Sequence, residues 1–412
     1  MRLLYNCSIY LYRIAISVAQ FFIPKAKKWV AGRKNWRAEM SALKAEKNIL
    51  WIHVASYGEF EQGKPVIEQL KTKFPAYKVL MTFFSPSGYE SKKDYEKVDF
   101  VHYLPLDTKR NARDFIDLIE PKIAIFVRYE FWFNYLYACH DREIPVIYFS
   151  SSFRSNQLYF KSYGTWFLQA LKQCELFLVR DKKSAEVLQE VGIHHSEVLG
   201  DTRFDSVMKN AQLNTTLPII ESFKEDKKLV VFGSTWGSDE VLIIKWLNEF
   251  ENLPFKVIIA PHEIDPNSVN DFQEQVKHKL VKYSDPQHEN AAVLWIDSIG
   301  LLKNIYRYAD LSYVGGGFGA GIHNLLEPAV FGKAVVFGPK HHKFQEAFEL
   351  KALGLGHVIQ KPNEFSPTIN ALLKVSNDNG KEKIGIEKVD LYFKQHEGAS
   401  EKILNRIADR MK

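Results

Sequence analysis

From Ile49 onward, short apolar runs rich in β-branched and aromatic residues alternate with segments whose apolar residues recur at helical spacing. This alternation predicts buried strands joined by amphipathic helices, that is, βαβ units of a parallel sheet. In the first half, the predicted strands are 49–55, 78–83, 100–103, 123–127, 145–149, 176–179 and 197–199. The predicted helices between them include 59–73, 110–118 and 182–190.

The alternation stops at residues 210–228, which are polar, contain a proline and show no clean period. A second series follows, with predicted strands at 229–232, 256–260, 292–295, 311–314 and 334–337 and predicted helices at 240–250, 265–279, 300–308 and 323–331. A chain of 412 residues has room for two such domains. We therefore expect an α/β protein of two doubly wound, Rossmann-like domains that face a cleft. The expected parts are an N-terminal membrane-anchoring helix 1–24, domains 25–209 and 229–399, a linker 210–228, and a C-terminal helix 400–412 that packs back toward the domain junction.

Residues 1–24 form an apolar N-terminus without an acidic residue, and a basic stretch from Lys25 to Arg37 follows it. Arg13 lies in the middle, and an arginine at a helix centre costs about 2.5–3.5 kcal/mol on insertion scales. A short transmembrane span, a helix in the membrane interface and a helix packed on its own protein all remain open. Basic residues after the apolar stretch predict that the rest of the chain lies on the cytoplasmic side.

Composition narrows the class of protein. The hydrophobic content of 46% and charged content of 25% are those of a globular protein, and a net charge of +6 does not by itself indicate nucleic acid. Cys7, Cys139 and Cys174 lack metal-ligand spacing, which favours a reducing compartment without a structural metal. The histidine pairs 194–195 and 341–342 are interpreted as surface residues. There is no P-loop, no GxSxG and no DxD pattern.

Two acidic residues follow predicted strands of the first half. Glu59 lies in HVASYGEFEQGKP after strand 49–55, and Glu130 lies in FVRYEFWFN after strand 123–127. Ligands of open α/β sheets bind at such strand ends, so the two carboxylates could divide work as general base and positioning group. The alternative for Glu59 is a solvated carboxylate in the first turn of a helix.

Two glycine-containing loops mark the second half. VGGGFGAGIHNLLEP follows strand 311–314, and FGSTWGSDE follows strand 229–232. Glycines let a backbone approach a phosphate, and helix N-termini supply N–H donors, with helices expected near His323 and Ser238. Asn324 and Glu327 are three apart on one predicted helical face, where a carboxylate could accept from ribose hydroxyls. Ordinary tight turns are the alternative.

In order and spacing, five blocks of the chain resemble the 3-deoxy-D-manno-octulosonate (Kdo) transferase family. They are WIHVASYGE (51–59), YEFWFN (129–134), LGDTRFD (199–205), FGSTWGSDE (232–240) and the glycine-rich segment 314–339. The resemblance implies a GT-B fold tethered to the inner face of the cytoplasmic membrane. It also implies inverting, metal-independent transfer of Kdo from CMP-Kdo to a lipid A precursor, an acylated glucosamine disaccharide bisphosphate, without a cofactor or nucleic acid.

The resemblance also assigns residues. Glu59 matches the general base of the family and Glu130 a second essential acid. The implied donor-binding residues are Gly233, Ser234, Thr235, His262, Ser298, Gly300, Gly316, Gly317, His323, Asn324 and Glu327. The implied acceptor-binding residues are Ser56, Gly58 and Arg154.

This sequence departs from the family pattern at several places. Pro261, His262 and Glu263 stand where the family has Pro-Arg-His, and Arg154 matches a family arginine only after a shift of one residue. Leu325 and Phe133 each replace a proline. The rival interpretations are another GT-B nucleotide-sugar transferase or epimerase, and a membrane-tethered scaffold without catalysis.

Overall fold

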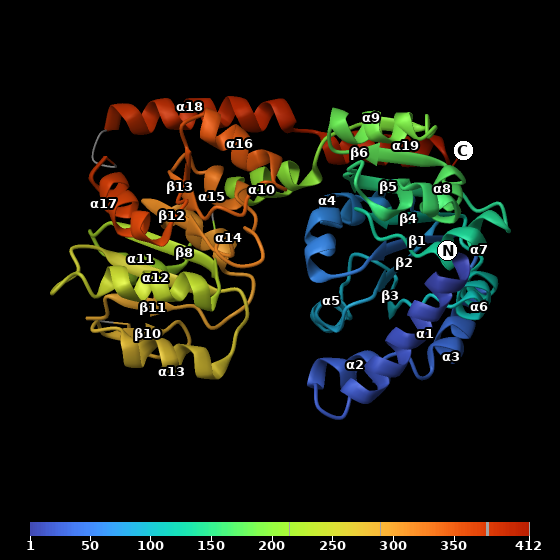
Figure 1. Cartoon of the computed structure of the whole chain (residues 1–412), viewed down its shortest axis with the longest axis horizontal. Helices are drawn as coiled ribbons and strands as arrows, with labels where there is room; N and C mark the ends of the chain where they lie inside the picture. Colours follow the sequence, from blue (N-terminus) through green and yellow to red (C-terminus); the bar gives the residue numbers. More distant parts are fainter. Residues whose placement is uncertain (214, 289, 376–378, 412) are drawn as a thin grey trace. The chain divides into compact units, whose positions relative to one another are not determined.

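The computed structural model describes the chain except residues 214, 289, 376–378 and 412. It contains two compact units, Met1–Ser206 with Gly398–Lys412, and Val207–Glu397 (Figure 1). We call them the N-terminal and the C-terminal unit. Each is described separately below.

The N-terminal unit is built on a parallel sheet in the order β3-β2-β1-β4-β5-β6-β7. The strands are β1 (Ile49–Val54), β2 (Lys78–Phe83), β3 (Phe100–Tyr103), β4 (Ile123–Val127), β5 (Val146–Ser151), β6 (Leu176–Val179) and β7 (Ser196–Val198). Its α-helices are α1 (Arg2–Ala19), α2 (Pro24–Ala31), α3 (Trp36–Ala42), α4 (Tyr57–Lys73), α5 (Pro86–Lys92), α6 (Lys109–Ile119), α7 (Phe133–His140), α8 (Thr165–Lys172), α9 (Lys182–Glu190) and α19 (Ala399–Asp409), and α10 (Thr202–Gln212) begins in it.

Helices cover both faces of this sheet, which explains why the strands read as continuous apolar runs. Trp51, Phe126 and Tyr148 point to the face covered by α3 and α6–α9. The alternate residues, such as Ile52 and Ile125, point to the face covered by α4 and α19.

The C-terminal unit repeats the design with the order β10-β11-β9-β8-β12-β13-β14, all parallel. The strands are β8 (Leu229–Thr235), β9 (Lys256–Pro261), β10 (Leu280–Lys282), β11 (Val293–Trp295), β12 (Leu311–Val314), β13 (Val335–Phe337) and β14 (Gly356–Val358). Its α-helices are α11 (Pro218–Lys224), α12 (Gly237–Leu247), α13 (Pro266–Gln275), α14 (Leu302–Ile305), α15 (Leu326–Ala329), α16 (Gln345–Ala352), α17 (Phe365–Val375) and α18 (Asn379–His396). Its core lies on both sides of the sheet, around Trp246 and Trp295 on one side and Ile258 and Leu294 on the other.

The predicted domain boundaries need correction. Residues 210–228 are not a linker, because they belong to the C-terminal unit and contain α11, whose Ile220 and Phe223 are buried in the core of that unit. The helix was not predicted because it is short and polar residues lie between its apolar positions. The C-terminal helix α19 belongs to the N-terminal unit, where Ile403 and Leu404 join the core beneath α4.

The apolar N-terminus folds onto its own unit. The Tyr5 hydroxyl donates to Asp107, Asn134 Nδ2 donates to Asn6 Oδ1 at 3.0 Å, and Ile9 is buried. The opposite side of α1 exposes large apolar residues, namely Leu3, Leu4, Leu11, Ile14 and Val18. Among the described residues no single helix has the length and apolarity to cross a membrane, whereas α1 and α2, bent by 120°, meet that criterion only as a pair.

Candidate functional site

The chain order of the N-terminal sheet reverses between neighbouring strands β1 and β4. Ser56, Gly58 and Glu59 follow β1, and Glu130 follows β4. A crevice for a ligand forms outside the carboxyl ends of strands at such a switch point. Both predicted carboxylates therefore lie at the position where this fold places its chemistry.

Glu59 lies in the first turn of α4 and is only 7% exposed, so it is not a solvated helix carboxylate. The hydroxyl of Ser56 donates to Glu59 Oε2, and Arg128 Nη1 lies 4.0 Å from Glu59 Oε1. A Cβ on Gly58 would meet only the Ser56 hydroxyl, at 3.8 Å, so this glycine leaves the approach to the turn open. The helix N-terminus adds a favourable field for the negative charge.

Glu130 has a raised pKa. Burial, followed by the charge of Glu59, raises the pKa of Glu130 to about 7 against the opposing charge of Arg128. A carboxyl with this pKa exchanges its proton near neutral pH, as a general acid–base group or a charge-sensitive positioning group requires. The structure thus brings Glu59 and Glu130 into electrostatic contact.

Arg128 is a site residue that the sequence analysis missed. Its backbone has φ of +68°, and its N–H donates to Phe149 O at 2.9 Å while its carbonyl accepts from Ser151 Oγ at 2.7 Å. This left-handed conformation turns the chain directly after β4, between the strand and Glu130. No sequence signal indicates it, because a non-glycine residue rarely adopts this conformation.

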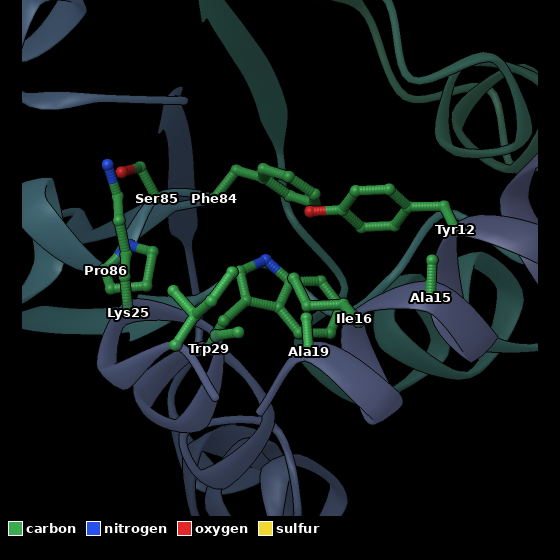
Figure 2. A pocket seen from close by; sticks show the side chains of 11 residues that line it. Tyr12, Ala15, Ile16, Ala19, Lys25, Trp29, Phe84, Ser85 and Pro86 are labelled. Atoms are coloured by element: carbon green, nitrogen blue, oxygen red, sulfur yellow. The ribbon is translucent and has the colours of Figure 1, made fainter. Parts of the chain in front are cut away.

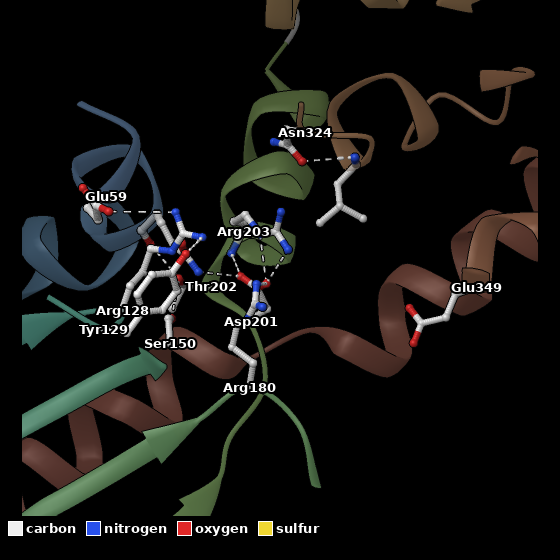
Figure 3. A network of polar contacts seen from close by, with 12 residues as sticks. Glu59, Arg128, Tyr129, Ser150, Arg180, Asp201, Thr202, Arg203, Asn324 and Glu349 are labelled. Atoms are coloured by element: carbon white, nitrogen blue, oxygen red, sulfur yellow. Dashed lines mark hydrogen bonds and ion pairs between the residues drawn. The ribbon is translucent and has the colours of Figure 1, made fainter. Parts of the chain in front are cut away.

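A buried polar network lies beside Glu59 (Figure 3). Asp201 is 7% exposed and accepts from Arg180 Nη1 at 3.1 Å and from Arg203 Nη2 at 2.7 Å. Burial alone would raise the pKa of Asp201, but the two guanidinium groups outweigh it and hold the pKa below its usual range. Gln62 of α4 donates to Asp201 Oδ1 at 3.1 Å, so the network holds the helix that carries Glu59.

Arg154, the third predicted acceptor residue, is exposed in the segment after β5, where its backbone N–H donates to Gln157 Oε1 at 2.8 Å. It lies at the carboxyl edge of the same sheet, since β5 neighbours β4. The described contacts do not join it to Glu59 or Glu130.

The C-terminal sheet has its own switch point, between β8 and β12. The two glycine-containing loops meet there, backbone against backbone. A Cβ on Gly315 would lie 2.4 Å from Ser234 O, and one on Gly317 would lie 2.5 Å from the Cα of Gly338. Gly233 packs instead on Tyr306, whose hydroxyl would lie 1.9 Å from a Cβ at Gly233. These contacts require glycine for close packing.

Asp239 joins the two loops and was also missed. It is fully buried in the first turn of α12 and accepts from Trp236 N at 3.0 Å, Gly316 N at 2.8 Å and Tyr313 OH at 2.7 Å. Acidic residues are common in the first turn of a helix, so the sequence does not distinguish Asp239 from a solvent-exposed one. The hydroxyl of Thr235 donates to the neighbouring Glu240 at 3.0 Å.

Three aromatic side chains stack at this edge. His262 lies between Trp236 and His323, with ring centroids 4.6 Å and 4.2 Å away respectively, and Trp236 Nε1 donates to His323 Nε2 at 2.9 Å. Burial, assisted by His262, lowers the pKa of His323 to about 4, and burial also lowers the pKa of His262. Both rings are therefore neutral at physiological pH, and the structure brings these two predicted residues together.

The remaining predicted donor residues divide into two groups. Asn324 Nδ2 donates to Glu327 Oε1 at 3.1 Å, but Asn324 precedes the helix, because α15 begins only at Leu326 and Asn324 Oδ1 accepts from its N–H at 3.1 Å. The predicted helix 323–331 was therefore too long at both ends, since residues 323–325 are loop and residues 330–331 belong to a turn that reaches Gly332. Ser298 and Gly300 are exposed in the loop after β11, and the described contacts do not join them to the stack.

His341 is buried rather than on the surface. Its ring packs on Phe337 at 5.3 Å, and its Nδ1 lies 3.3 Å from Gly338 O. In the part of the chain that the structure describes, no three His, Cys, Asp or Glu side chains are grouped so that they could hold a metal ion.

Solved structures share this fold. The UDP-GlcNAc 2-epimerase of Neisseria meningitidis matches with a TM-score of 0.60 at 16% identity, over 88% of this chain and 100% of that chain. A glycosyltransferase from Rickettsia africae matches with a TM-score of 0.60 at 12% identity, over 89% and 99% of the respective chains. The protein is thus an α/β protein with a GT-B-like fold, and its polar residues lie at the switch points of two parallel sheets.

Sequence comparisons find similarity to Kdo transferases. Residues 33–206 match the family model described as 3-deoxy-D-manno-octulosonic-acid transferase (kdotransferase). Relatives named 3-deoxy-D-manno-octulosonic acid transferase are 27% identical in Aquifex aeolicus, over 82% of this chain and 89% of the relative, and 26% identical in Haemophilus influenzae, over 87% and 86%. The chain is thus similar in sequence to Kdo transferases, through residues 33–206 to their family model and over most of its length to the named relatives.

Proposed function

We propose that the protein transfers Kdo from CMP-Kdo to a lipid A precursor, an acylated glucosamine disaccharide bisphosphate, with inversion and without a metal ion. The observation that carries this proposal is the shielded carboxylate of Glu59, at the switch point of a unit that matches the Kdo transferase family model. Kdo is proposed as the transferred sugar because the relatives are named as transferases of this sugar.

In the proposed reaction, an acceptor hydroxyl oxygen attacks C2 of Kdo from the side opposite the phosphate. The bond between C2 and the phosphate oxygen breaks, CMP leaves with the electron pair, and the proton of the hydroxyl passes to Glu59. A positioned base of this kind contributes about 10²–10⁴-fold. Ser56 and Arg128 orient the carboxylate of Glu59. The displacement releases one proton, and Glu59 is the base that accepts it.

Glu130 acts in this proposal as the second acidic group, which positions the acceptor and changes its charge near pH 7. Ser56, Gly58 and Arg154 are the proposed acceptor contacts around the same sheet edge. The low exposure of Glu59 limits competition from water, which would otherwise hydrolyse the donor.

The donor is proposed to bind at the switch point of the C-terminal unit. The loops after β8 and β12 offer backbone N–H groups to the phosphate of CMP, and neutral His262 and His323 offer ring N–H donors or stacking surface without excess charge. Asn324 and Glu327 are proposed to accept from the ribose, with Ser298 and Gly300 at the rim.

The acceptor requires access to a membrane. The exposed apolar side of α1, together with the exposed lysines of α2 and Lys34 of the following turn, is proposed to lie on the cytoplasmic surface of the inner membrane. Contacts of Tyr5 and Asn6 with the globular unit favour a helix in the interface plane over a separate span.

Mass spectrometry of a lipid A precursor incubated with CMP-Kdo tests the proposal. Wild type should add the mass of Kdo, and Glu59→Gln should lose the activity by about 10²-fold or more while it still binds CMP. Glu68→Gln is a matched control on the same helix, since the partly exposed Glu68 pairs with Lys64 at 3.7 Å and accepts from the Tyr95 hydroxyl at 2.9 Å, a bond that a glutamine oxygen can also accept.

The other outcomes separate the rivals. Addition of Kdo by Glu59→Gln at the wild-type rate would refute the base assignment. Turnover of UDP-sugars in place of CMP-Kdo would indicate another GT-B transferase or an epimerase. Nucleotide binding without turnover of either donor would indicate a scaffold.

A further inference from the structure

The N-terminal unit contains an apolar cavity of about 430 Å³ that the catalytic proposal does not use (Figure 2). Tyr12, Ile16 and Ala19 of α1 form one wall, Trp29 of α2 lies at its base, and Phe84 and Pro86 close the other side. We call it the α1–α2 pocket. Its volume lies in the range of small-molecule sites in proteins.

The pocket follows from the pattern of α1. Tyr12, Ile16 and Ala19 recur at i, i+4 and i+7, so they share one helical face. The other apolar residues of α1, such as Ile14 and Val18, are exposed on the outside. Ile23 also lines the pocket and is exposed, so the pocket opens beside exposed apolar residues that follow α1.

The base of the pocket is rigid. The guanidinium of Arg33 lies 4.0 Å from the ring centroid of Trp29 and 5.0 Å from that of Phe84. It donates to Leu104 O at 2.8 Å and to Phe84 O at 2.7 Å. Trp29 and Phe84 are therefore held in place, and the cavity is pre-formed.

The pocket is continuous with the candidate catalytic edge. Phe84 and Ser85 donate through their backbone N–H groups to Ala55 O at 3.1 and 2.7 Å, and Ala55 immediately precedes Ser56. On the other side Phe84 packs on Trp132 with ring centroids 4.5 Å apart, two residues beyond Glu130. Phe84 is thus a common wall of the pocket and of the two loops that carry the carboxylates.

The mouth is polar on one side only. Lys25 and Ser85 line the pocket, and Figure 2 shows the lysine amine and the serine hydroxyl at the same end. A ligand that suits this site has an apolar chain and an anionic or hydroxylated head. An acylated sugar phosphate has this combination.

We propose that the α1–α2 pocket binds one acyl chain of the lipid acceptor and thereby sets the position of its sugar hydroxyl at Glu59. The inference rests on the proposed function, because it takes the acceptor to be an acylated sugar phosphate. The pocket makes the enzyme selective for acceptors that carry a sufficiently long chain. The bound acyl chain fixes the position of the polar head along the sheet edge formed by the ends of β1, β2 and β4.

Acceptor kinetics test the pocket. Ala19→Trp fills it, and Val18→Trp places the same side chain on the outer side of the same helix. With a long-chain acceptor, Ala19→Trp should raise KM about tenfold or more, since each methylene kept from an apolar site costs about fourfold. With a deacylated acceptor it should match wild type. Val18→Trp, on the proposed membrane-facing side, should keep the wild-type ratio between the KM values for the two acceptors when both are presented in detergent. Equal KM values for Ala19→Trp and wild type on the long-chain acceptor would overturn the inference.

Photo-crosslinking measures whether the acyl chain occupies the pocket, and it does not require turnover. An acceptor with a diazirine at the end of its acyl chain should label peptides that contain Trp29 or Phe84 in wild-type protein and much less in Ala19→Trp. A phospholipid with the same diazirine should not label them; equal labelling would make the pocket a general lipid site and overturn the proposal. If wild type transfers Kdo to none of the acceptors, the proposed function fails, while the crosslinks still decide whether the pocket takes the chain.

Ala15→Trp guards against a folding defect, because Ala15 is exposed and lines the same cavity. It should reproduce the loss on the long-chain acceptor while its circular dichroism and its activity on the deacylated acceptor stay at wild-type values. If Ala15→Trp has the wild-type KM for the long-chain acceptor, and if both Ala15→Trp and Ala19→Trp are crosslinked as wild type is, these results would overturn the proposal that the pocket binds the acyl chain.

Discussion

Asp201→Asn tests whether the buried network holds the N-terminal unit together beside Glu59. The carboxylate accepts from Arg180 at 3.1 Å and from Arg203 at 2.9 and 2.7 Å, and these guanidinium groups are only 18% and 17% exposed. An asparagine has nearly the same shape, but its amide nitrogen is a donor and would face donors of the arginines. The variant therefore removes the charge and leaves two partly buried cations without their shared anion.

The expected loss of stability is large. Removal of one partner from a buried ion pair costs about 3–5 kcal/mol, because the other charge stays buried without compensation. For a unit of this size, each kcal/mol lowers Tm by about 2–4 °C, so the transition of the N-terminal unit should fall by about 6–20 °C. An exposed pair gives the contrast. Asp114→Asn breaks a contact with Arg37, whose side chain is 46% exposed, and should lose at most about 1 kcal/mol.

The pH dependence has a definite sign. The pKa of Asp201 is lower in the folded protein than in the unfolded chain, so its contribution to stability is present above about pH 4 and is lost as the pH falls toward the folded-state pKa. The difference between wild type and Asp201→Asn should therefore be constant from about pH 5 to 8 and shrink below about pH 4, where the Asp201 carboxyl takes up a proton in the unfolded wild-type chain but not yet in the folded protein.

Urea unfolding of the full-length protein at several pH values, followed by circular dichroism, measures this difference. Asp114→Asn is the control at each pH. A difference below about 1 kcal/mol at pH 7, or one that does not diminish in acid, would show that the two arginines do not depend on Asp201 for their burial.

Three further outcomes are expected. Glu130→Gln should remove a rise in transfer rate with a midpoint near pH 7, because the pKa of Glu130 is raised to about 7 and its ionisation changes the charge at the acceptor site; a rise that persists in the variant would refute this assignment. Asp239→Asn should weaken CMP binding, measured by calorimetry, about tenfold, since one of the three hydrogen-bond donors of Asp239 loses its acceptor. Unchanged affinity would show that the two loops do not contribute to CMP binding. Excess EDTA should leave the rate of Kdo transfer unchanged, and a loss restored by Mg²⁺ would refute metal independence.

Sequence periodicity predicted the sheets well for a physical reason. Strands covered on both faces must be apolar throughout, so β2, β3, β4 and β6 are confirmed at their predicted ends. Short elements with mixed composition were missed or misplaced. The edge strands β10 and β14 have three residues each, and α15 is shorter than the loop pattern around it indicated.

The candidate site was predictable only in part. Glu59 and Glu130 could be found because strand ends are visible in the sequence and carboxylates at such ends are informative. Arg128 could not, since its left-handed backbone depends on contacts with Phe149 and Ser151 of the neighbouring strand. Asp239 could not either, because its three donors come from residues up to 77 positions away.

The two switch points differ in the chemistry that they can supply. The first combines Glu59 and Glu130 with Arg128, so it can accept a proton and respond to charge. The second combines glycine loops held together by Asp239 with imidazoles that are neutral at physiological pH, which suits a phosphate and a flat ring better than proton transfer. A glycosyl transfer needs both kinds of chemistry, and the chain places them in different units. It follows that variants of the first switch point should lower kcat with little change in donor affinity, whereas variants of the second should act mainly on donor binding. The opposite partition would mean that the roles proposed for the two units are exchanged.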